Sequence, residues 1–229
     1  METTTETYKC KYCEKEFKRE STLAAHLCEP KRRHNQQNEK GVQIGLNAYL
    51  RFYEMTQGSS KYKTYEDFAK SPYYGAFVKF GRQCVMINAI NVERYIDWLL
   101  KNNKKLDHWA KDSMYDEYLQ QYLRTEALTD ALQRAINYSI TWGEEKGCEP
   151  HDVLRYGNSN TVTYAISTGK ISPWIIYNCA SGQQFLNNMN TEQIQIVWPW
   201  IDSDFWQKKF RDYPADQAYA EEILKQAGW

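Results

Sequence analysis

Two cysteines near the start of the chain have a spacing that is typical of metal-binding sites. Cys10 and Cys13 are separated by two residues, which lets a tight turn aim both thiolates at one ion. Twelve residues separate Cys13 from His26, and seven more separate His26 from His34. Thiolate and imidazole groups are the ligands that Zn²⁺ prefers in structural sites. The spacing therefore predicts that a short N-terminal unit folds around a zinc ion.

The residues between these side chains resemble a Cys2His2 zinc finger. Phe17 falls four positions after Cys13, Leu23 falls six after Phe17, and His26 falls three after Leu23. This order is similar to the family pattern C-x2-C-x3-F-x5-L-x2-H followed by a second histidine. The resemblance covers residues 8–34 and implies a ββα unit in which Phe17 and Leu23 form a small apolar core. In such a unit a short helix presents His26 to the metal.

The fourth ligand is the point at which the chain departs from the family pattern. The two histidines of a finger are normally three to five residues apart, and here the separation is longer and contains Pro30. Proline is expected to end the helix near Cys28, so that His34 would return to the metal from a loop. Cys28 is the alternative, although two residues beyond His26 on a helix it would point to a different side. A more open turn after His26 would bring Cys28 in. We predict a zinc site formed by Cys10, Cys13, His26 and His34, with Cys28 as the alternative to His34.

The overall charge of the chain limits the kind of partner that it can bind. Basic and acidic residues are equal at 29 each, so the formal net charge is zero. This balance excludes a strongly basic nucleic-acid binder at the level of the whole chain, but it allows a local basic patch. Residues 8–35 carry eight basic side chains and four acidic ones, a local net charge of +4. The predicted finger is therefore the basic part of the chain.

Five basic side chains of this region are candidate nucleic-acid contacts. In the docking geometry of the finger family, Arg19 would occupy the first base-reading position, where a guanidinium can donate two hydrogen bonds to guanine. One finger covers about three base pairs, which is too few for useful specificity. We therefore expect contacts mainly to the phosphate backbone of nucleic acid, DNA rather than RNA, through Lys18, Arg19, Lys31, Arg32 and Arg33.

Localisation and membrane contact are predicted from what the sequence lacks. No apolar run approaches the roughly 20 residues that cross a bilayer, and the first ten residues contain no apolar signal region. We expect a cytoplasmic protein without a membrane partner. In that reducing compartment closely spaced cysteines are expected to hold a metal rather than to form disulfides.

The remainder of the chain carries helical patterns. Predicted helix starts include Asn91, Ser172 before Pro173, and Asn190 with Gln193 three residues later. The longest predicted helix covers residues 113–147 and ends at Gly143 or Gly147. We predict a mainly α protein with a zinc finger at 1–36, a linker at 37–44 and an all-α domain at 45–229. Residues 147–157 are a candidate division of that domain.

Tryptophan recurs along this helical region at helix faces and helix ends. Such side chains could stack on unpaired bases, but helical spacing already explains their positions as core residues. We assign to the core Trp98, Trp109, Trp142, Trp174, Trp198, Trp200 and Trp206.

Catalysis has little support in the sequence. His108 and His151 are the histidines outside the predicted finger, and neither lies in a serine or cysteine nucleophile motif. A glycine-rich phosphate-binding loop is also absent from the sequence. We therefore expect a protein that binds but does not catalyse.

A second, weaker resemblance covers residues 45–225. The order of helices and aromatic residues is similar to that of the helicase-loading proteins of T-even and related phages, and it is carried by SPYYGAFVKFGR, ERYIDWLLKNNKKLDHW, STGKISPWIIYNCASGQQFL and IDSDFWQKKFRDYPADQAYAEEIL. The resemblance implies a phage replication factor in the host cytoplasm. Its partners would be forked DNA, single-strand-binding protein and a replicative helicase. The alternative from another class is a protein–protein adaptor that uses the finger and the aromatic helical region.

Overall fold

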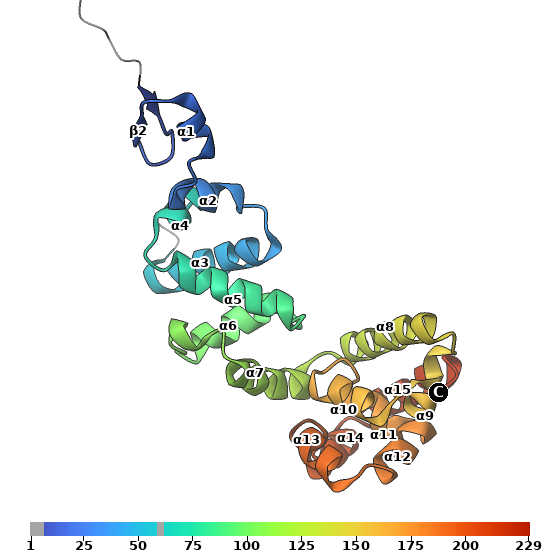
Figure 1. The fold of residues 1–229 in the computed structure, drawn as a ribbon. Coiled ribbons are helices and arrows are strands. Elements are labelled where there is room, and N and C mark those ends of the chain that lie inside the picture. Colours follow the sequence, from blue (N-terminus) through green and yellow to red (C-terminus); the bar gives the residue numbers. More distant parts are fainter. Residues whose placement is uncertain (1–6, 59–61) are drawn as a thin grey trace, which may run out of the picture. The chain divides into compact units, whose positions relative to one another are not determined.

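The computed structural model describes residues 7–58 and 62–229 and is mainly helical (Figure 1), which confirms the predicted fold class. Strand structure in the described residues is limited to β1 (Tyr8–Lys9) and β2 (Glu16–Phe17), which pair antiparallel. No described helix combines the length and the apolar character that crossing a membrane requires. The chain divides into two compact units, residues 1–115 and 116–229. This division lies inside one helix and not at the candidate division of 147–157.

The first unit contains the strand pair and the helices that follow it. Its helices are α1 (Glu20–Ala25), α2 (Glu29–Asn35), α3 (Lys40–Gln57), α4 (Tyr65–Lys70), α5 (Tyr74–Met86), α6 (Val92–Lys101) and the 3-10 turn η1 (Leu106–His108). Helix α7 (Asp112–Thr125) carries the division between the units.

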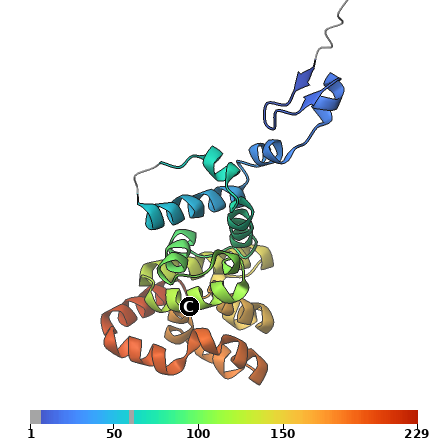
Figure 2. The ribbon, with the colours of Figure 1, turned by 90° about the vertical axis from the view of Figure 1, so that its left-hand side faces the viewer.

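Helices α3 and α5 pack against each other and form the centre of the first unit (Figures 1 and 2). Their backbones approach so closely that a Cβ added to Gly81 would lie 2.0 Å from the carbonyl oxygen of Gly41. Phe77 and Phe80 on α5 are fully buried, and each packs edge-on against the ring of Trp109. The core of this unit is therefore aromatic.

The second unit is built from the remaining helices. They are α8 (Leu128–Lys146), η2 (Pro150–Asp152), α9 (Val153–Tyr156), α10 (Ser159–Ser167), α11 (Pro173–Asn178), α12 (Ala180–Asn187), α13 (Thr191–Ile201), α14 (Ser203–Asp212) and α15 (Pro214–Gln226). Trp174 on α11 packs against Trp206 and Phe210 on α14, with ring centroids 5.9 and 5.1 Å away.

The predicted helix starts are present as capping hydrogen bonds. The side chain of Asn91 accepts from the amide of Arg94, and that of Ser172 accepts from the amide of Trp174. Asn190 and Gln193 form a reciprocal capping box. Six of the seven tryptophans assigned to the core are buried, and Trp198 is the exception at 49% exposed.

Three predicted boundaries differ from the structure. The predicted helix over 113–147 is interrupted: α7 ends at Thr125 and α8 begins at Leu128, because Ala127 has an extended backbone. The predicted linker 37–44 is shorter in the structure because α3 already begins at Lys40. Gly41 and Gly45, near the start of α3, allow its backbone to approach α5 closely. The sequence pattern also predicts that the helix starting at Asn190 ends at Pro199, whereas in the structure Pro199 lies inside α13.

Candidate metal centre

The turn between β1 and β2 positions the first two thiols. The amide of Cys10 donates to the carbonyl of Lys15, and the amide of Glu14 donates to the carbonyl of Cys10. Glu14 takes a left-handed backbone conformation with φ of 61°, which closes the turn tightly. The Sγ atoms of Cys10 and Cys13 thereby lie within 4.8 Å of each other, and the Cys10 side chain is buried.

Helix α1 positions the histidine. Phe17 and Leu23 are both half-buried, as expected for the small apolar core of such a unit. The ring of Phe17 lies 4.7 Å from the ring of His26. The helix stops at Ala25, and His26 follows it with an extended backbone. The imidazole therefore lies just past the helix end, facing the cysteine turn.

Four side chains form one compact group of metal-ligand atoms in this region. The ligand atoms of Cys10, Cys13, His26 and Cys28 all lie within 4.8 Å of one another. Cys13 Sγ is 3.2 Å from His26 Nε2, and Cys10 Sγ is 3.9 Å from Cys28 Sγ. All three cysteines are free thiols in the structure.

These distances fit a tetrahedral metal site. With metal–sulfur bonds of about 2.3 Å and metal–nitrogen bonds of about 2.0 Å, tetrahedral geometry places two sulfurs roughly 3.8 Å apart and a sulfur and a nitrogen roughly 3.5 Å apart. The observed sulfur–sulfur separation of 3.9 Å and sulfur–nitrogen separation of 3.2 Å are both close to these values. A disulfide would need a sulfur–sulfur distance of about 2.05 Å, so Cys10 and Cys28 are arranged as two ligands and not as a bonded pair.

The fourth member of the group is Cys28, and His34 is not a member. The preference for His34 over Cys28 depends on a helix that continues from His26 to Cys28 and points the Cys28 side chain to a different side. Instead α1 ends at Ala25, and the extended backbone at His26 and Cys28 turns the Cys28 thiol toward the other ligands. This is the open turn after His26 that the sequence allowed as the way to bring Cys28 into the group. His34 is exposed on the last turn of α2, where its ring lies 5.0 Å from the ring of Tyr12.

Pro30 has the opposite effect from the one expected. It occupies the first turn of α2, where a missing amide costs nothing, and it starts a helix rather than leaving a loop. Cys28 is the N-cap residue of that helix. The sequence signal that could have identified Cys28 is therefore the Glu29–Pro30 helix start directly after it.

The backbone around Cys10 favours its thiolate. Hydrogen bonds from the amides of Tyr12 and Cys13 lower the pKa of Cys10 from 9.0 to about 7. The thiolate is the form that binds a metal ion.

The five predicted nucleic-acid contacts have different environments. Lys18 and Arg19 are exposed at the start of α1. Lys31 is half-buried and its amine donates to the carbonyl of His26, 3.0 Å away. Arg32 and Arg33 both lie on α2 and both pair with Glu29.

Arg33 is bound into the fold. Its guanidinium donates to the carbonyl of Ala69 and lies 4.3 Å from the ring centroid of Tyr74. Its own carbonyl accepts from the hydroxyl of Tyr65. The side chain of Arg33 is 24% exposed, against 56% for Arg32. Arg33 therefore holds α2 against α4 and α5, and Arg32 is the arginine that faces solvent.

No family model, curated protein or solved structure matches this chain.

Proposed function

We propose that this chain is a zinc-binding protein that contacts nucleic acid and catalyses no reaction. The observation that carries the proposal is the group formed by Cys10, Cys13, His26 and Cys28. Its ligand atoms are close enough together to coordinate one metal ion tetrahedrally. Three thiolates and one imidazole are a donor set that selects zinc over magnesium or calcium. Because the protein fills all four positions, no site is left for substrate, and the metal would be structural.

A structural role for the metal is consistent with the small size of this unit. Phe17 and Leu23 are only half-buried, so the segment from β1 to Cys28 buries little apolar surface of its own. A unit of this size needs a metal or a disulfide to fold. Zinc binding would supply that folding free energy directly.

Nucleic-acid contact is the function proposed for the basic side chains near the metal. Lys18 and Arg19 are exposed before α1, and Arg32 is exposed on α2. In a chain with zero net charge, a basic cluster beside a metal-stabilised unit favours an anionic partner. A role of the helicase-loader type would add a preference for forked DNA.

The experiment has two stages. Elemental analysis of the freshly purified protein should find one zinc ion per chain. Titration of labelled single-stranded, duplex and forked DNA should then give binding at low salt that weakens steeply as salt rises. Absence of binding at low salt would reject nucleic acid as the partner and favour the adaptor, whose apolar contacts would depend little on salt.

A further inference from the structure

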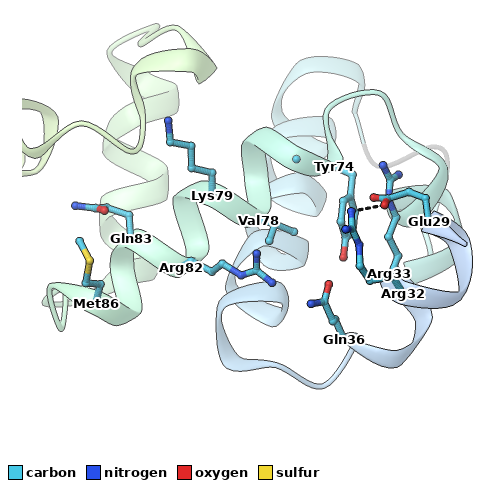
Figure 3. Close-up of a pocket in the computed structure, with 11 residues that line it drawn as sticks. Glu29, Arg32, Arg33, Gln36, Tyr74, Val78, Lys79, Arg82, Gln83 and Met86 are labelled. Atoms are coloured by element: carbon cyan, nitrogen blue, oxygen red, sulfur yellow. Dashed lines mark hydrogen bonds and ion pairs between the residues drawn. The ribbon is translucent and has the colours of Figure 1, made fainter. Parts of the chain in front are cut away.

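Helices α2 and α5 face each other across an open groove in the first unit (Figure 3). The groove has a volume of about 510 Å³. On each of the two helices, the lining side chains recur at intervals of three or four positions. Each helix therefore presents a single face to the groove. Residues of the two walls include Arg32, Gln36, Lys79, Arg82 and Gln83.

The charged side chains that line this groove are predominantly basic. Four are cationic and one, Glu29, is acidic. The cations are Arg32 and Arg33 from α2 and Lys79 and Arg82 from α5. Figure 3 shows Arg82 reaching from α5 toward Gln36 at the end of α2. The groove is therefore a concentrated positive surface on a chain whose total charge is zero.

Three of the four cations are exposed to solvent, although Arg32 pairs with Glu29 and Arg82 pairs with Glu39. Arg33 is occupied by its contacts to Glu29, Ala69 and Tyr74. Arg32 is 56% exposed and Arg82 is 49% exposed, and Lys79 is also exposed. Guanidinium groups in this setting can form paired hydrogen bonds with phosphate oxygens.

We infer that the groove between α2 and α5 binds the phosphate backbone of a nucleic acid through Arg32, Lys79 and Arg82. The inference rests on the proposed function and assigns its contact surface. It adds Lys79 and Arg82, which the sequence did not single out, and it gives Arg33 a positioning role. Because the contacts go to phosphates, the groove reads no base sequence.

Two carboxylates compete with the ligand, Glu29 at Arg32 and Glu39 at Arg82. Glu39 accepts two hydrogen bonds from Arg82, at 2.7 and 2.8 Å. A phosphate that binds Arg82 must share this guanidinium or displace Glu39. Removing the negative charge of Glu39 should therefore strengthen nucleic-acid binding, whereas a residue with a purely structural role would give no gain on mutation.

The test compares groove variants with a matched control in the full chain. Arg32→Ala, Lys79→Ala and Arg82→Ala remove the three cations, and Glu39→Gln frees Arg82. Lys101→Ala removes an exposed lysine at the end of α6, in the same unit but outside the groove. Binding of labelled single-stranded and duplex DNA is measured by fluorescence anisotropy over a range of salt concentrations. Circular dichroism of each variant checks that it is folded.

Each alanine variant should reduce the slope of log K against log salt by about 0.9 on duplex or about 0.7 on single strands. The triple variant should lose all three contacts, Glu39→Gln should bind more tightly, and Lys101→Ala should match the wild type. If the triple variant keeps the wild-type slope while Lys18→Ala or Arg19→Ala reduces it, the groove inference fails and the proposed function stands. If the wild type binds no DNA at low salt, both fail.

Discussion

The thiol of Cys28 lies 3.9 Å from the thiol of Cys10, and Cys28 is also the N-cap residue of α2. One residue thus belongs both to the candidate metal centre and to the helix that lines the basic groove. Through Arg33, α2 is in turn bonded to α4. A metal ion held by this group would therefore be linked to the position of α2 through a short covalent path.

Chelation of zinc should unfold the segment from β1 to Cys28 and leave the helices from α3 onward folded. The core of α3 and α5 is aromatic and contains no part of the metal centre. Hydrogen exchange measured by residue, with and without a chelator, would locate the loss of protection. We expect it in residues 8–28 and in the first turn of α2. Loss of protection throughout α3 and α5 would contradict this prediction.

Arg33→Ala should destabilise the first unit, whereas Arg32→Ala should not. Arg33 has contacts to Glu29, Ala69 and Tyr74, and its loss should cost about 2 kcal/mol through broken hydrogen bonds and packing. Arg32 is exposed, so its replacement should stay within about 0.5 kcal/mol. Urea unfolding of the two neighbouring variants provides the comparison. Equal stability of the two variants would show that the Arg33 contacts contribute nothing.

Gly81→Ala should destabilise the packing of α3 on α5. The new methyl group would lie 2.0 Å from the carbonyl oxygen of Gly41, and backbone cannot move aside as a flexible side chain can. We expect a cost of about 3 kcal/mol from overpacking. Gly75→Ala on the same helix is the control, because an added Cβ there meets nothing within 4 Å. Thermal unfolding should show a lower midpoint for Gly81→Ala and no loss for Gly75→Ala.

Glu126→Ala should destabilise the second unit. The side chain of Glu126 is fully buried, and its two oxygens accept hydrogen bonds from the guanidinium of Arg134 at 2.5 and 2.8 Å. Truncating Glu126 leaves the 18%-exposed Arg134 without this carboxylate, a change that costs about 3 kcal/mol for a buried pair.

The exposed pair of Glu66 and Lys70 provides the control for this measurement. Both side chains are more than four-fifths exposed, so Glu66→Ala should cost less than about 1 kcal/mol. Chemical unfolding that gives the two glutamate variants the same stability would show that burial of the Glu126 pair has no energetic consequence.

The helix starts could be predicted from sequence because capping is local. Asn91, Ser172 and Asn190 each bond to an amide two or three residues ahead, so the relevant partners are adjacent in the chain. The break between α7 and α8 could not be predicted in this way. It falls at Glu126 and Ala127, where no proline or glycine marks it, and Glu126 is held by Arg134 eight positions later.

The metal centre shows the same limit. The grouping of Cys10, Cys13 and His26 could be predicted from their spacing, because a tight turn and a short helix fix their positions. The fourth ligand depends on where α1 ends, and Ala24 and Ala25 give no stop signal since alanine is the strongest helix former. The presence of Cys28 rather than His34 in the group could therefore be seen only in the structure.

The zinc affinity of Cys28→Ala compared with that of His34→Ala tests the Cys3His centre most directly. A competition titration with a chromophoric chelator measures both variants against the wild type, and Co²⁺ substitution reports thiolate coordination through its charge-transfer absorption. We predict that His34→Ala binds one zinc ion as tightly as the wild type, and that Cys28→Ala loses most of its affinity and part of the thiolate absorption. Tight binding by Cys28→Ala together with loss of binding by His34→Ala would contradict the Cys3His centre.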